Sequence, residues 1–179
     1  MRSKYFNRRF FLTLTLLFLV MSNSTLMSQN DIEFIKEKFT IINTEKEYKI
    51  VNATNEDIFD DVIDAHYELS GYFKGDTLFK IIEKIYSPTW VVFREFYIWH
   101  NELIFLYKKN QAYHYDGETD EIDYEVLELV NELRLYYKNG DLIKTIPIED
   151  QTKAESEQNE IFESYKKYID ILNDKNNMP

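Results

Sequence analysis

Three stretches of the chain share one pattern, and this pattern constrains the fold more than any other feature. Aligned on Leu78, Leu103 and Leu142, each has a tyrosine six residues earlier and a Phe or Ile directly after the leucine. Between the tyrosine and the leucine of each stretch stands a dipeptide that fits a turn: Gly75-Asp76, His100-Asn101 and Asn139-Gly140. Asn-Gly favours a type I′ turn and Gly-Asp a type II′ turn, and both turns join antiparallel strands. The type of the middle turn stays open, because a residue with a Cβ resists positive φ. The pattern predicts three β-hairpins with two-residue loops.

These loops also predict which side chains share a face, because side chains alternate along a strand. One face collects Phe73, Leu78, Ile98, Leu103, Tyr137 and Leu142. The other collects the expected cross-strand pairs Tyr72–Phe79, Tyr97–Ile104 and Tyr136–Ile143. Two interpretations remain open: both faces are covered as core, or the second face exposes a tyrosine-rich platform, since tyrosine is favoured at interfaces. The candidate partner-binding residues are Tyr72, Tyr97, Trp99 and Tyr136.

Helical patterns stand on either side of the hairpins. Apolar residues recur every three or four positions from Ile32 to Ile42, which predicts a helix over 30–43. Thr152 and Glu155 have the spacing of a capping box, and we expect a second helix from about 153 to 173. Between the two helices, we expect residues 47–51 to form a short strand or a last helical turn, and residues 52–65 to form a loop or short helix. Residues 120–127 are expected to form a loop or short helix, and residues 129–138 a strand. The predicted fold class is α+β, with an N-terminal helix, an antiparallel meander of about five to seven strands and a C-terminal helix.

The first 28 residues have the order of a secretory signal peptide. Four basic residues precede an apolar run over 10–21, and small or polar residues follow. The run has 12 residues, fewer than the about 20 that a transmembrane helix needs. We expect cleavage after Ser28, with Ser24 as the alternative. A single α+β domain over 29–175 and a frayed tail at 176–179 then follow. The expected location is periplasmic or secreted, with no stable membrane anchor after signal cleavage.

Charge and composition narrow the classes of partner. The chain carries a net charge of −11, and without the first 28 residues 17 basic residues face 32 acidic ones, a net of −15. Nucleic acid is therefore disfavoured, whereas a basic protein partner is compatible with the charge. Cysteine is absent, so disulfides and thiolate metal sites are excluded.

Catalytic chemistry has little support in the sequence. We find no phosphate-binding loop, no nucleophile elbow and no zinc-binding helix motif. The three histidines, His66, His100 and His114, lie in different segments. The acidic stretch with Asp116, Glu118 and Asp120 could hold Ca²⁺, but its glycine does not stand where a calcium loop needs one, which favours a solvated loop. We predict no catalytic residue, no metal site and no cofactor.

The hairpin stretches also carry a resemblance. "ELSGYFKGDTLFK" (68–80), "EFYIWHNELIF" (95–105) and "ELRLYYKNGDLIK" (132–144), set between two helices, resemble a group of exported bacterial proteins of unknown function. The resemblance implies an antiparallel meander between helices and implies no activity. We expect an exported, non-enzymatic binding or inhibitor-type domain. The alternatives are a small periplasmic enzyme or ligand-carrying pocket in a curved sheet, and a structural component of the envelope.

Overall fold

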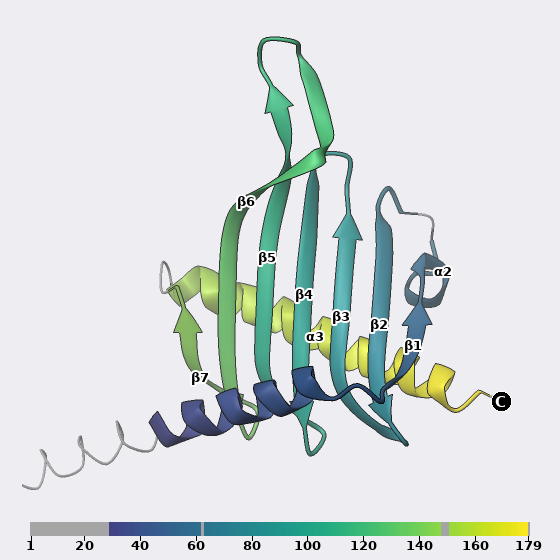
Figure 1. The fold of residues 1–179 in the computed structure, drawn as a ribbon, viewed down its shortest axis with the longest axis vertical. Coiled ribbons are helices and arrows are strands. Elements are labelled where there is room, and N and C mark those ends of the chain that lie inside the picture. Colours follow the sequence, from purple (N-terminus) through teal and green to yellow (C-terminus); the bar gives the residue numbers. More distant parts are fainter. Residues whose placement is uncertain (1–28, 62, 148–150, 179) are drawn as a thin grey trace, which may run out of the picture. The chain divides into compact units, whose positions relative to one another are not determined.

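The fold has an antiparallel sheet with one helix before it and another after it in the sequence, as the α+β prediction requires (Figure 1). The computed structural model describes residues 29–61, 63–147 and 151–178. The predicted signal peptide lies outside these residues. Within them, the helices are too short or too polar to cross a membrane.

The chain divides into two compact units. The first ends at Glu37, and its described residues, 29–37, are helical. The second unit runs from Lys38 onward, and its first residues, 38–44, are also helical. This agrees with the predicted N-terminal helix over 30–43.

The second unit contains one seven-stranded sheet whose strands follow the order of the chain. The strands are β1 (Lys49–Ala53), β2 (His66–Lys74), β3 (Thr77–Tyr86), β4 (Trp90–Trp99), β5 (Glu102–Asp116), β6 (Glu121–Lys138) and β7 (Asp141–Ile146). Each strand pairs antiparallel with the next, from β1 to β7. The short helix α2 (Asn55–Ile58) follows β1, and the long helix α3 (Gln151–Asn176) follows the sheet. The helix therefore continues into the tail that was expected to fray.

The three predicted hairpins have two-residue loops. Asn139 and Gly140 have φ of 52° and 84°, as a type I′ turn requires. Gly75 has a φ of 61°, and Asp76 does not share the positive φ, which fits type II′. His100 and Asn101 have φ of 52° and 64°, so the middle turn has the same backbone signs as the Asn-Gly turn.

Each hairpin also carries a β-bulge at the same place. The pairs beside the turns are the expected ones: Phe73–Leu78, Ile98–Leu103 and Tyr137–Leu142. The next pairs skip one residue and become Tyr72–Lys80, Tyr97–Phe105 and Tyr136–Lys144. The expected pairs of Tyr72, Tyr97 and Tyr136 with Phe79, Ile104 and Ile143 are therefore wrong. Phe79, Ile104 and Ile143 are the additional residues that form the bulges. A bulge strengthens the local twist of the strand.

Helix α3 covers the first of the two predicted faces (Figure 1). Phe73, Leu78, Ile98, Leu103 and Tyr137 are all buried in one cluster with apolar residues of α3. The ring of Phe96 stacks on Tyr165, with centroids 5.8 Å apart. Burying a side chain of this size contributes about 1.5–3 kcal/mol. The main core thus lies between the sheet and α3.

Strand β6 differs most from the expectation. The predicted loop or short helix at 120–127 is wrong, because the residues from Glu121 to Lys138 form one strand. Its pairing with β5 is interrupted twice, at Val130 and at residues 124–126. β7 pairs only with Arg134–Lys138, so among the described residues no strand lies beside 121–133 on that side. Figure 1 shows the β5–β6 hairpin projecting beyond the other strands.

Candidate functional site

The predicted platform tyrosine Tyr97 is buried, with 1% of its surface exposed. Its ring lies 4.7 Å from that of Phe39, and Lys80 sits 4.9 Å above it. Its hydroxyl donates to Glu95 Oε2 over 3.1 Å and accepts from Asn43 Nδ2 over 3.2 Å. Burial, followed by the nearby Glu95 carboxylate, raises the pKa of Tyr97, so the phenol is neutral. This side chain is a packed and hydrogen-bonded element of the fold.

The other three candidates lie on the same face and are covered to different degrees. Tyr136 is buried and packs on Phe105, with ring centroids 4.9 Å apart. Tyr72 and Trp99 are half-buried. The ring centroids of Tyr72 and Tyr48 are 5.9 Å apart. Lys38 Nζ lies 4.9 Å from the centre of the Trp99 ring. The structure therefore brings the four residues together but favours the interpretation in which this face is covered.

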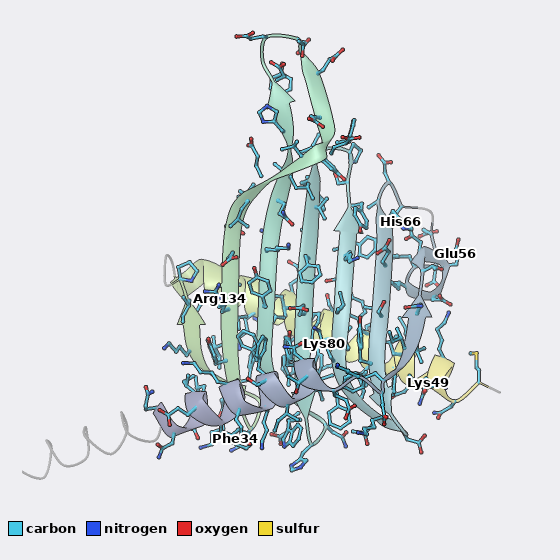
Figure 2. The ribbon with its side chains drawn as sticks, viewed as in Figure 1. Phe34, Lys49, Glu56, His66, Lys80 and Arg134 are labelled. Atoms are coloured by element: carbon cyan, nitrogen blue, oxygen red, sulfur yellow. The ribbon has the colours of Figure 1, made fainter. Side chains whose placement is uncertain are left out.

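Cations lie over aromatic rings along this face of the sheet. Two of these cations belong to Lys80 and Arg134, which are labelled in Figure 2. The guanidinium of Arg134 lies 5.7 Å from the centre of the Tyr107 ring. Tyr107 donates to Glu132 Oε1 over 2.6 Å. Burial raises the pKa of Tyr107 to about 12, and the hydrogen bond to Glu132 is the second largest cause. Such contacts cover the ring faces that a partner would need.

The calcium candidate uses its carboxylates to build a turn. Asp116 Oδ1 accepts from the backbone nitrogen of Glu118 over 2.8 Å, and this bond is the main reason that the pKa of Asp116 is lowered. Asp120 accepts from the hydroxyl of Tyr115. In the described part of the chain, no group of three or more His, Asp or Glu side chains could hold a metal ion.

A row of charged residues lies under α3, and the sequence interpretation missed it. Glu83, Arg94 and Lys108 are buried and stand directly opposite one another on β3, β4 and β5. Arg94 Nη1 donates to Glu83 Oε2 over 3.0 Å, and the Tyr168 hydroxyl donates to the other Glu83 oxygen. Glu83 stands between Ile81 and Ile85 in the buried alternation of β3, and this position was the available signal. The row joins the sheet to α3.

A hollow of about 390 Å³ lies between two hairpin tips and the end of α3. Its lining residues are Asp76, Leu78, Ile98, Asn101, Ile169, Asn173, Asn176 and Asn177. Amide side chains can donate and accept hydrogen bonds, but general acid–base chemistry needs a titratable pair, and Asp76 is the one ionisable residue of this lining. The hollow therefore gives no support to a catalytic site.

The outer part of the β5–β6 hairpin, residues 110–133, forms the strongest candidate site, and we call it the hairpin surface. Its β5 residues pair with β4 as far as Ala112, and its tip projects beyond that point. Five large apolar side chains on β6 are between 40% and 62% exposed: Tyr124, Val126, Leu127, Leu129 and Val130. The same segment contains eight carboxylate residues and no Lys or Arg. Exposed apolar side chains that lie along one strand, with polar groups around them, mark an interaction site.

Several contacts across the strands hold the hairpin surface together. His114 Nδ1 lies 2.6 Å from Glu128 Oε1, and this bond is the main reason that the pKa of His114 is raised. Asn110 donates to Asn131 over 2.8 Å. The rings of Tyr113 and Tyr124 meet edge to face with centroids 5.0 Å apart. The surface is thus an ordered strand pair.

The sequence interpretation assigned 120–127 to a loop or short helix and 129–138 to a strand, and it did not single out these apolar residues. A signal was present, since acidic and apolar residues alternate from Glu121 to Val126. A scan against models of protein families finds no match for this chain. Searches of curated proteins and of solved structures find none either.

Proposed function

We propose that this chain is an exported, non-enzymatic binding domain that binds a basic protein through the hairpin surface. Export is supported by the basic and apolar order of the first 28 residues. One observation carries the binding function: five exposed apolar side chains stand among eight carboxylates in a hairpin segment without Lys or Arg.

The two kinds of side chain have different tasks in this proposal. Carboxylates attract a basic partner over a distance and raise the rate of association. The apolar side chains Leu129 and Val130, which are 57% and 62% exposed, then lose their contact with water. Each such burial contributes about 1.5–3 kcal/mol at most. A basic enzyme or toxin is the class of partner that such a domain would inhibit.

The test is a capture experiment with a matched control. The protein is compared with a Leu129→Ser variant and with an Ile50→Ser variant as baits for proteins of the cell envelope. Ile50 is 52% exposed on β1, so its substitution removes a similar apolar area from another part of the sheet. We expect the wild type and Ile50→Ser to capture the same basic protein, and Leu129→Ser to lose it.

A salt series gives the second criterion. The captured protein should leave the bait as the salt concentration rises, because screening weakens attraction between exposed charges. Equal recovery on Leu129→Ser and on the wild type would contradict the proposal, as would a captured set of acidic proteins.

A further inference from the structure

We infer that the open edge of β6, residues 121–133, takes up an extended basic segment of the partner as an additional strand of the sheet. This inference rests on the proposed function and adds the way in which the partner binds. It assigns the main-chain groups of β6, besides its side chains, to the binding site.

The first observation is that, within the described part of the chain, this part of β6 has a neighbouring strand on one side only. β5 pairs with it, whereas β7 begins to pair only at Arg134. Alternate residues of a strand direct their N–H and C=O groups away from a given neighbour. Such an open edge is a template for another strand, and added strands gain affinity from main-chain hydrogen bonds.

The second observation is the arrangement of side chains along this edge. Leu127 and Leu129 stand opposite Tyr113 and Gln111 of β5, on one face of the hairpin. Glu128 stands opposite Ala112 and contacts His114 on the other face. A strand beside this edge therefore meets apolar side chains on one face and a carboxylate on the other. A segment that alternates apolar residues with Lys or Arg fits this arrangement.

Charge distinguishes this occupant from a second copy of the chain. Two copies paired edge to edge would bring together strands that both carry Glu121, Asp123, Glu125 and Glu128. Like charges opposite each other destabilise a strand pair. The edge thus excludes its own copies and accepts a basic strand.

The experiment uses two synthetic peptides and the full protein as it accumulates in cells. Both peptides alternate lysine with valine, and the second is N-methylated at every other residue, which removes the donors along one edge without changing the charge. We expect the first peptide to bind and to slow amide exchange within 121–133. The N-methylated peptide should bind at least about tenfold more weakly. Exchange in β1, the far edge of the sheet, serves as the internal control.

The outcomes separate this inference from the proposed function. Equal binding of both peptides, with no change of exchange in 121–133, would overturn strand addition and leave recognition by charge and apolar contact intact. Failure of both peptides to bind would overturn the inference and the proposed function together. Slowed exchange in β1 as well as β6 would show unselective edge pairing and would also overturn the inference.

Discussion

Arg94 Nη1 donates to Glu83 Oε2 over 3.0 Å from the directly opposite position of the neighbouring strand, beneath α3. Both side chains are almost completely enclosed. We predict that Arg94→Met destabilises the fold by about 3–5 kcal/mol, because it leaves a buried carboxylate without its cation. Urea unfolding followed by the fluorescence of Trp90 and Trp99 measures this loss.

The control is the double variant Glu83→Leu with Arg94→Met. It removes both charges, and we expect it to recover most of the lost stability, since an apolar pair often replaces a buried ion pair without cost. A double variant as unstable as Arg94→Met alone would contradict this account of the pair.

Gly71 on β2 faces Leu172 of α3. A Cβ at this position would lie 2.9 Å from Phe73 Cε2 and 3.0 Å from Leu172 Cδ1. We predict that Gly71→Ala costs about 1–3 kcal/mol through overpacking. Adding Leu172→Ala makes room for the new methyl group, so the double-mutant cycle should show a favourable coupling between the two substitutions. Strict additivity would show that the contact with Leu172 is not the cause.

The middle hairpin turn holds two residues with side chains at positive φ. His100 and Asn101 have φ of 52° and 64°, and this region costs an L-residue energy that glycine avoids. We predict that His100→Asn combined with Asn101→Gly stabilises the fold by about 1 kcal/mol, measured by urea unfolding. A decrease in stability would show that the His100 side chain makes a contribution larger than the relief of strain.

The pair of His114 and Glu128 predicts a pH dependence within the hairpin surface. The carboxylate raises the pKa of His114 above its ordinary value of 6.5. The contribution of the pair is therefore fully present below about pH 6.5 and is lost as the pH rises through the raised pKa. NMR titration of His114 should show the pKa returning toward 6.5 in Glu128→Gln. Amide exchange in 127–129 should quicken with rising pH more in the wild type than in this variant, after correction for intrinsic exchange rates. An unchanged His114 titration in Glu128→Gln would argue against the pair.

Local chemistry in the sequence was sufficient to predict the hairpins. The turn dipeptides, flanked by residues with the alternation of β-strands, defined the loops at 75–76, 100–101 and 139–140. The bulges beyond them could not be predicted in the same way. The extra residues of the bulges, Phe79, Ile104 and Ile143, are apolar like the other residues of their strands, so the sequence does not mark them. Only the pairing with the neighbouring strand shows which residue lacks a partner there.

Bulges also explain the wrong assignment within β6. The interruptions at 124–126 and at Val130 break the alternation of the strand. As a result, Val126, Leu129, Val130 and Leu133 fall at spacings that also occur on a helix face. The candidate site could not be predicted for a related reason. The sequence shows apolar residues at these positions, but only the short reach of β7 determines that they stay exposed.

The position of α3 after all seven strands has a consequence for the order of folding. The strands can pair one after another as the chain emerges, because every pairing joins neighbours in the sequence. The apolar face of that sheet stays open until the 26 residues of α3 are available to cover it. A nascent chain that still lacks α3 can pair its strands but cannot cover the apolar face of the sheet, so the finished domain forms only after α3 has been synthesised.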